Sequence, residues 1–208
     1  MRPADLTVFI VEDDAAVRDS LALLLSLEGY RTAVYADAEA MLEAWQRAHR
    51  GCVLADLRLP GMSGIELQAE LARRGSSLPF IIVTAHGDVR SARAAFRAAA
   101  VDFLEKPFDE AQLKNAVAAA CAQDEQRRQR AEREQADAQR LALLTLRERE
   151  VLAHCARGLQ SKEIAAVLGI SPRTVESHKA SMMTKLGVRN VLELVRFAHE
   201  AYPPGEAP

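Results

Sequence analysis

The chain has 208 residues, of which 49% are hydrophobic, 27% are charged and 5% are aromatic. This composition is typical of a soluble globular protein and excludes a disordered or fibrous chain, and the length is sufficient for two small domains. The formal net charge of −2 is too close to zero to indicate that the chain as a whole binds nucleic acid.

The charge is unevenly distributed along the chain. Residues 1–121 carry 13 Lys and Arg against 17 Asp and Glu, whereas residues 141–208 carry nine against seven. We therefore expect the two halves to meet different partners. No stretch of roughly 18 uncharged apolar residues occurs, and acids interrupt the N-terminal segment MRPADLTVFIVEDD, so we expect a cytoplasmic protein without a signal peptide.

The cysteines lack the spacing of metal ligands. Cys52, Cys121 and Cys155 lie far apart in the sequence. We expect them to be small buried hydrophobic side chains rather than parts of a disulfide framework or a zinc site.

Residues 6–121 alternate short β-branched apolar runs with amphipathic segments, which predicts βαβ units in a doubly wound α/β domain with a five-stranded parallel sheet. The expected strands are Thr7–Val11, Thr32–Tyr35, Cys52–Ala55, Phe80–Thr84 and Asp102–Leu104. The expected helices are Ala15–Leu27, Ala38–Ala48, Gly64–Arg74, Val89–Ala98 and Glu110–Cys121.

Polar residues collect at the carboxyl ends of these strands. Glu12 and Asp13 follow the first strand and Asp56 follows the third, while Thr84 ends the fourth and Lys106 follows the fifth. Doubly wound sheets bind ligands at this edge. Clustered carboxylates need a cation, and Mg²⁺ suits a site that also takes a phosphoryl group. The pattern predicts a carboxylate nucleophile, a metal that neutralises phosphoryl oxygens, and two donors that hold the product.

The motifs VEDD, DLRLPGMSG, VTAHGD and FLEKPF resemble the receiver domain of response regulators, over residues 6–121. The resemblance implies a flavodoxin-like fold in which Asp56 is the phosphoacceptor, and Thr84 and Lys106 bind the phosphoryl group. It also implies a Mg²⁺ site made of Glu12, Asp13, Asp56 and the backbone carbonyl of Arg58, with Asp14 as a third acid beside the pair. Thr84 and Phe103 match the positions of the family's conformational switch.

One position departs from the receiver pattern. The segment RAAAVDF has Ala99 where related receivers commonly have Gly. If this residue ends a helix with a positive φ, Ala costs about 1 kcal/mol relative to Gly.

Residues 123–140 are polar almost throughout, with five acids, five arginines and neither Gly nor Pro. Strong helix formers dominate, so we expect a solvated helix that continues the last receiver helix. A coiled coil is the alternative, although the only apolar candidates for its seam are alanines.

Residues 145–200 show helical periodicity and no strand signal. Thr145 and Glu148 form a capping box, and Gly158 ends the first helix. The next three helices are expected at Lys162–Leu168, Pro172–Leu186 and Val191–Ala201. Two short helices joined at Gly169 within a four-helix unit are typical of a helix-turn-helix domain.

The segment from LTLREREVL to LGVRNVLELV resembles LuxR/FixJ/NarL-type helix-turn-helix domains, over residues 144–198. The resemblance implies that Pro172–Leu186 is a recognition helix in the major groove. The candidate DNA-contacting residues are Lys162, Arg173, Thr174, Glu176, Ser177, His178, Lys179, Ala180 and Lys185. Glu176 would accept from cytosine N4 and read sequence. The apolar face of Val191–Phe197 could be a dimer seam or ordinary core.

These expectations combine into a phosphorylation-switched transcriptional regulator, with closest resemblance to FixJ-like regulators. The expected parts are a receiver (1–121), a polar helical linker (122–143), a DNA-binding domain (144–201) and a flexible tail (202–208). The expected partners are a sensor histidine kinase, a double-stranded DNA operator, RNA polymerase and a second copy of the chain, with activation as the output. No enzyme activity is expected beyond Mg²⁺-dependent self-phosphorylation from phosphodonors and slow autodephosphorylation. The alternatives are an aspartyl-phosphate phosphatase and a protein-interaction adaptor.

Overall fold

The computed structural model describes residues 5–85 and 102–202, which form two compact units, Met1–Gln129 and Arg130–Pro208. The expected helix Val89–Ala98 and the position Ala99 lie outside the described residues. No described helix combines the length and the apolar character that crossing a membrane requires.

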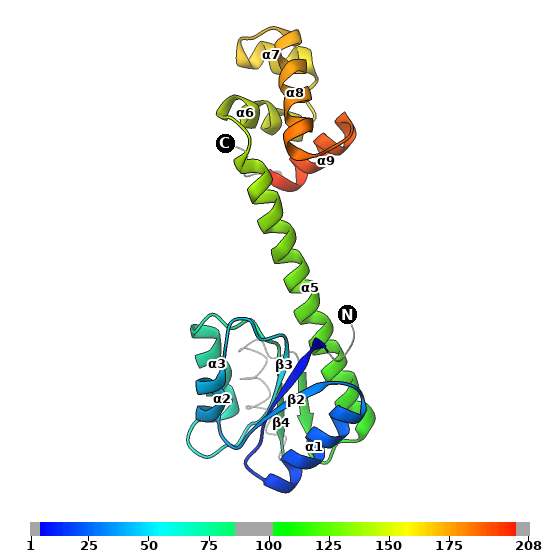
Figure 1. Ribbon diagram of the computed structural model, residues 1–208. Helices are drawn as coiled ribbons and strands as arrows, with labels where there is room; N and C mark the ends of the chain where they lie inside the picture. The colour runs from blue at the N-terminus through cyan, green and yellow to red at the C-terminus, as the bar shows by residue number, and fades with distance from the viewer. Residues whose placement is uncertain (1–4, 86–101, 203–208) are drawn as a thin grey trace. The chain divides into compact units, whose positions relative to one another are not determined.

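The first unit contains a parallel five-stranded sheet with strand order β2-β1-β3-β4-β5, which confirms the predicted fold class. The strands are β1 (Thr7–Val11), β2 (Arg31–Tyr35), β3 (Gly51–Asp56), β4 (Phe80–Thr84) and β5 (Asp102–Glu105). The described helices of this unit are α1 (Ala15–Leu27), α2 (Ala38–Ala44), α3 (Gly64–Arg73) and the first part of α5 (Glu110–Ala142). α1 and α5 cover one face of the sheet, and α2 and α3 cover the other (Figure 1).

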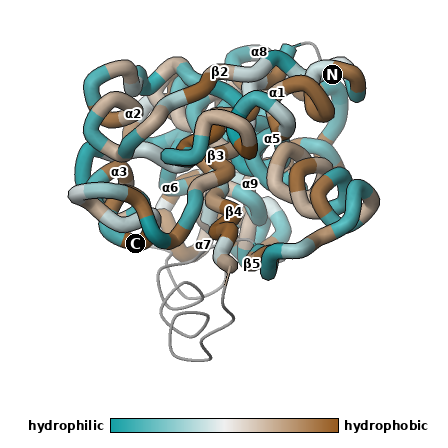
Figure 2. Tube along the Cα trace, turned by 90° about the horizontal axis from the view of Figure 1, so that it is seen from below, coloured by the Kyte–Doolittle hydropathy of each residue, from teal (hydrophilic) through white to brown (hydrophobic). Residues whose placement is uncertain are grey.

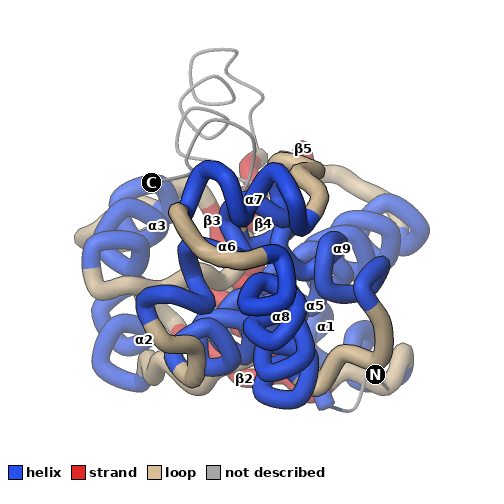
Figure 3. The backbone as a smooth tube through the Cα atoms, turned by 90° about the horizontal axis from the view of Figure 1, so that it is seen from above, coloured by secondary structure: helices blue, strands red, loops and turns tan. Residues whose placement is uncertain are grey.

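The alternation of side chains along each strand builds two cores. Val8 and Ile10 pack against α1 and α5, whereas Phe9 and Val11 pack against α2 and α3. All six residues of β3 are buried, as expected for a parallel strand covered on both faces. The view in Figure 2 colours much of β3 and β4 as hydrophobic, and Figure 3 shows strands lying between α2 and α3 on one side and α1 on the other.

α2 is shorter than the sequence predicts. It ends at Ala44 rather than Ala48, because Trp45 adopts an extended conformation. The chain then turns, with the Gln46 amide donating to His49 Nδ1 at 3.3 Å. The His49 ring lies 4.8 Å from the Phe9 ring, centroid to centroid. Side-chain packing therefore overrides the helical periodicity of this segment.

The second unit is helical. α6 (Leu146–Ala156), α7 (Ser161–Leu168), α8 (Pro172–Leu186) and α9 (Val191–Ala201) follow α5. Gly169 and Gly187 end α7 and α8 with φ values of 65° and 68°, the left-handed conformation that Gly adopts without steric cost.

The apolar core of the second unit collects residues from all four of these helices. Its buried side chains include Leu152, Ile164, Val175, Met182, Leu186, Leu194 and Phe197. α9 buries Leu194 and Phe197 in this core but exposes 45% of Val191 and 80% of Leu192. One face of α9 therefore belongs to the core. Only its exposed residues, such as Val191 and Leu192, are available for a dimer contact.

Candidate functional site

Three strands bring Glu12, Asp56 and Lys106 together at the carboxyl edge of the sheet. Glu12 follows β1, Asp56 ends β3 and Lys106 follows β5. The Lys106 ammonium donates to Glu12 Oε2 at 2.6 Å and to Asp56 Oδ2 at 2.7 Å. The other Asp56 oxygen accepts from the Arg58 backbone amide at 2.8 Å. The two carboxylates are 3% and 8% exposed, so one ammonium lies between two nearly buried acids.

The surroundings shift the pKa values of two of these groups. Burial raises the pKa of Glu12, and the hydrogen bond from Lys106 offsets this only in part. Burial alone would lower the pKa of Lys106, but hydrogen bonds to Asp56 and Glu12 raise it overall. Lys106 therefore stays protonated at neutral pH and supplies a fixed positive charge at the Asp56 carboxylate.

The two predicted switch residues, Thr84 and Phe103, lie on the adjoining strands. Thr84 ends β4 and is buried, and its carbonyl accepts from the Lys106 amide at 2.7 Å. Phe103 lies on β5, is half-buried, and packs against the core shared with α2 and α3. The peptide bond between Lys106 and Pro107 is cis. The structure thus connects Thr84 to the loop that carries Lys106.

The acids after Glu12 differ from one another. Asp14 caps α1, with one carboxylate oxygen accepting from the amides of Ala16 and Val17 at 2.8 and 3.1 Å. An Asp directly before a helix is an N-cap signal. The capping role of Asp14 could therefore have been predicted from the sequence, although the sequence analysis assigned it only as a third acid beside Glu12 and Asp13. Asp13 is exposed. Within residues 5–85 and 102–202, no three Asp, Glu, His or Cys side chains are close enough together to hold a metal ion.

Arg18 is a second contributor that the sequence analysis missed. Its guanidinium donates to the backbone carbonyls of Glu12 and Asp13 at 2.7 and 3.2 Å. Arg18 thereby holds the loop between β1 and α1, which carries two of the predicted metal ligands.

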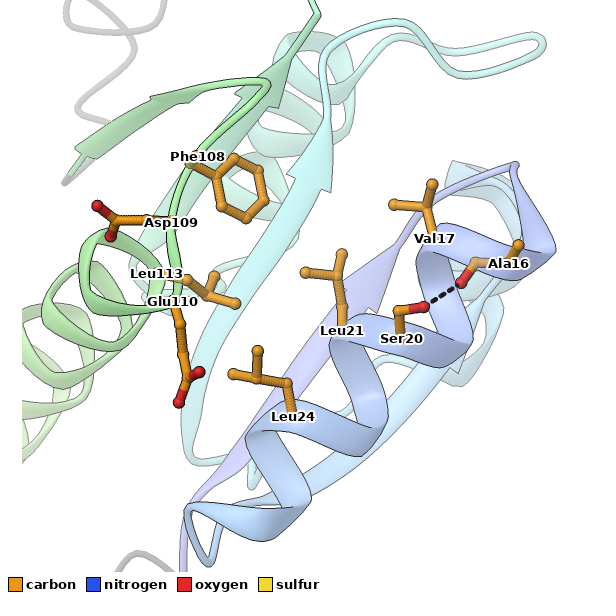
Figure 4. A pocket seen from close by; sticks show the side chains of 9 residues that line it. All are labelled: Ala16, Val17, Ser20, Leu21, Leu24, Phe108, Asp109, Glu110 and Leu113. Atoms are coloured by element: carbon orange, nitrogen blue, oxygen red, sulfur yellow. Dashed lines mark hydrogen bonds between the residues drawn. The ribbon is translucent and has the colours of Figure 1, made fainter.

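An apolar groove of about 350 Å³ lies between α1 and the start of α5. Val17, Leu21 and Leu24 of α1 face Phe108 and Leu113 across it (Figure 4). Its other lining residues are Ala16, Ser20, Asp109 and Glu110. The two segments that line the groove begin only a few residues after residues of the carboxylate site. The first follows Asp13 and the second follows Lys106.

In the second unit, most of the predicted DNA-contacting residues lie on an accessible surface. Lys162 of α7 is exposed and His178 of α8 is half-buried. The exposed residues of α8 in this set are Arg173, Thr174, Glu176, Ser177 and Ala180. These positions are compatible with a recognition helix that presents one face to DNA.

Two of the candidate DNA-contacting residues, Lys179 and Lys185, make contacts within the second unit, and the exposure that a DNA contact requires is contradicted for Lys179. Lys179 is 7% exposed, and its ammonium donates to the Ser161 hydroxyl of α7 at 2.6 Å. Lys185 is half-buried and donates to both carboxylate oxygens of Glu148, at 2.9 and 2.7 Å. Their charges hold α8 against α7 and α6.

Glu148 is the buried centre of the α6–α8 contact. Besides Lys185, its carboxylate accepts from Ser181 Oγ at 2.7 Å and from the Thr145 amide and hydroxyl at 2.8 and 3.0 Å. Burial alone would raise the pKa of Glu148, but these hydrogen bonds lower it to about 2. The capping box expected from the sequence is present, and its Glu148 also holds α8.

Glu176 belongs to a second small network. Its carboxylate accepts from the Ser161 hydroxyl, and Lys179 Nζ lies 3.7 Å from the same oxygen. Since Lys179 also donates to Ser161, the predicted base-reading side chain is held by two neighbours.

Comparison with known proteins gives matches over both units. Residues 8–118 match the response regulator receiver domain, and residues 142–198 match the bacterial regulatory proteins of the luxR family. The transcriptional regulatory protein FixJ of Azorhizobium caulinodans is 46% identical over 197 residues, which cover 94% of this chain and 93% of that protein.

Two solved structures match nearly the whole chain. That of the response regulator StyR has a TM-score of 0.81 and 39% identity, and the match covers 93% of this chain and 98% of that chain. That of full-length FixJ from B. japonicum has a TM-score of 0.59 and 41% identity, with coverage of 94% and 96%.

Replacing Glu148 with Gln tests the buried network. The depressed pKa means that the Glu148 carboxylate stabilises the fold above the unfolded pKa near 4.5 and loses this contribution as the pH falls toward 2. We expect Glu148→Gln to lower the free energy of unfolding at pH 7 by about 1.5–3 kcal/mol. Urea unfolding followed by circular dichroism measures this difference.

The matched control is Glu150→Gln on the same helix, where an exposed pair with Arg147 is worth at most about 1 kcal/mol. The difference between the two variants should shrink as the pH approaches 3. Equal effects of the two substitutions at pH 7 would contradict the role of Glu148.

Proposed function

The chain belongs to the two-component response regulators that join a receiver domain to a LuxR-type DNA-binding domain, and we propose that phosphorylation of Asp56 by a sensor histidine kinase controls its binding to DNA. The observation that carries this proposal is the Lys106 ammonium shared by Glu12 and Asp56. This charge already lies beside the carboxylate that would become an acyl phosphate.

In the proposed transfer, an Asp56 oxygen forms a bond to the phosphorus of a phosphohistidine while the bond from phosphorus to nitrogen breaks. Lys106 and the Thr84 hydroxyl then hold the transferred phosphoryl oxygens. The same chemistry accounts for self-phosphorylation from small phosphodonors and for slow autodephosphorylation by water, neither of which makes the protein an enzyme for another substrate.

The proposed metal site uses Glu12, Asp13, Asp56 and the backbone carbonyl of Arg58. These are hard oxygen donors of the kind that Mg²⁺ prefers. The convergence of Glu12 and Asp56 on one positive charge supports the fit, as do the contacts of Arg18 with the loop of Glu12 and Asp13. Asp13 is exposed and does not gather with the other two acids among the described residues, so it would join them only when the ion binds. Bound Mg²⁺ would neutralise part of the charge on the phosphoryl oxygens.

The proposed output is dimerisation and operator binding in the cytoplasm, with recruitment of RNA polymerase and activation of transcription. Thr84 and Phe103 lie on adjacent strands that contact the site and the α2–α3 core, so a change at the phosphoryl group can reach the surface of the receiver. Arg173, Thr174 and His178 would contact phosphates, and Glu176, Ser177 and Ala180 would contact bases.

The first test is size-exclusion chromatography with light scattering, with Mg²⁺ alone and with Mg²⁺ plus beryllofluoride, which imitates the phosphoryl group. We expect the wild-type chain to change from monomer to dimer only with beryllofluoride. Asp56→Asn should stay monomeric in both conditions, because it lacks the carboxylate that coordinates beryllium. A wild-type chain that shows no change would refute dimerisation as the output.

The groove between α1 and α5 is proposed as the docking surface for the kinase, because the two segments that line it follow Asp13 and Lys106 closely in the sequence. Ser20→Arg places a long cation in the groove and should slow phosphotransfer from an autophosphorylated partner kinase by at least about tenfold. Labelling of Asp56 by acetyl phosphate should not change. Leu23→Arg, on an exposed position of α1 outside the groove, is the control and should leave both reactions unchanged.

The assignment of Glu176 predicts a separable effect on sequence preference. In selection from a random DNA pool, Glu176→Ala should lose a preference for cytosine at one position of each half-site. Arg173→Ala should instead keep the preference and reduce the slope of log affinity against log salt by about one. A cytosine preference that survives in Glu176→Ala would rule out its reading role.

A further inference from the structure

Asp124 is a fully buried acid within a segment that the sequence describes as a solvated polar helix. Its side chain has 0% exposure, although it lies in the arginine-rich part of α5. The expectation of a fully solvated helix is therefore wrong at this position. Burial of a carboxylate costs folding free energy unless the group is paired and hydrogen-bonded.

Three donors satisfy the Asp124 carboxylate. Arg127 donates to Oδ1 at 2.8 Å, and Arg128 donates to Oδ2 at 3.0 Å. The backbone amide of Gly51, the first residue of β3, also donates to Oδ2 at 3.0 Å. Arg128 further donates to the carbonyl of His49. The network therefore joins α5 to the segment that enters β3.

Gly51 occupies a position where only glycine fits. Its φ is 123°, and a Cβ atom there would lie 2.0 Å from the Thr7 carbonyl oxygen of β1. The amide that donates to Asp124 therefore belongs to a residue held closely against the neighbouring strand. β3 thus contacts Asp124 through its first residue and carries Asp56 as its last.

The buried face of α5 continues through this network. Leu113, Val117, Cys121 and Asp124 are buried at spacings of three or four residues. Arg128, which follows Asp124 by four, is only 23% exposed. Arg127 and Gln123 also line a hollow of about 210 Å³ together with residues of the α3–β4 connection. One face of α5 therefore continues to pack against the first unit as far as Arg128, while Ala122 and Gln126 on the opposite side are exposed.

We propose that Asp124 is the positioning residue that couples the receiver to the rest of α5. It fixes the first turns of the polar helix to the amino end of β3, the strand whose carboxyl end bears Asp56. A change at the phosphorylation site can then reach the helix that leads to the DNA-binding domain. The coupling role rests on the proposed function, whereas the anchoring of residues 122–128 does not.

Asp124→Asn in the full-length chain tests the anchor. It removes the charge that pairs with both arginines but keeps the size of the side chain. Trypsin cleavage after Arg127 and Arg128 should be slow in the wild type and should rise about tenfold in the variant. Cleavage after Arg130 and Arg133 should be unchanged, and hydrogen exchange at the Gly51 amide should accelerate.

The coupling is tested by gel shift with and without acetyl phosphate. The ratio of the two DNA-binding midpoints, of the order of tenfold in the wild type, should fall toward one in Asp124→Asn. Labelling of Asp56 and the unphosphorylated midpoint should be unchanged. A wild type without any such ratio would refute the proposed function, while the trypsin and exchange results would still decide whether Asp124 anchors α5.

The matched control is Asp137→Asn. Asp137 lies on the same helix and also pairs with an arginine three residues later, at 3.5 Å, but its side chain is 33% exposed. It should behave as the wild type in every assay. If Asp124→Asn proves too unstable to assay, Arg128→Gln removes the contact with His49. It also removes the tryptic site at 128, so its readouts are faster cleavage after Arg127 and the same loss of coupling. Wild-type cleavage and a wild-type midpoint ratio in Asp124→Asn would overturn the proposal.

Discussion

The receiver depends on β3 being buried along its whole length. A strand that is covered on both faces does not bend or slip independently of its two cores, so a displacement at one end moves the strand as a unit. Asp56 is the last residue of this strand, so its carboxylate is held in a fixed position at the sheet edge. The groups that contact it come from the neighbouring strand ends, and the geometry of the site follows from the parallel register of β1, β3, β4 and β5.

Buried carboxylates recur in this chain, and each is neutralised by cations from another turn or another element. Asp56 shares Lys106 with Glu12, Asp124 pairs with Arg127 and Arg128, and Glu148 pairs with Lys185. Removing one partner from such a group leaves a charge without compensation. These contacts therefore specify how elements dock, as well as contributing to stability.

Much of the architecture was accessible from the sequence because it is encoded by local periodicity. The strands, the capping box of Thr145 and Glu148 and the turn at Gly169 are each predicted from a few neighbouring residues. The gathering of Glu12, Asp56 and Lys106 was also predictable, since parallel strands bring their carboxyl ends to one edge.

What the sequence analysis missed depends on contacts between distant segments. Lys179 occupies a polar position in the pattern of α8, and only the approach of Ser161 shows that its charge is used internally. Asp124 continues the buried stripe of α5 with a polar residue, which a hydrophobic pattern cannot register. The early end of α2 likewise depends on the packing of His49 against Phe9.

The contacts of Lys179 and Lys185 within the second unit separate two tasks on α8, which we propose as the recognition helix. Residues that hold α8 in place are distinct from the exposed residues Ser177 and Ala180, whose side chains make no hydrogen bond to Lys179 or Lys185 among the described residues. Such a surface can acquire new side chains while the helix keeps its angle to the domain. Proteins with this arrangement can change the DNA sequence that they prefer by point substitutions on the exposed face of α8, while the contacts that hold the helix stay the same.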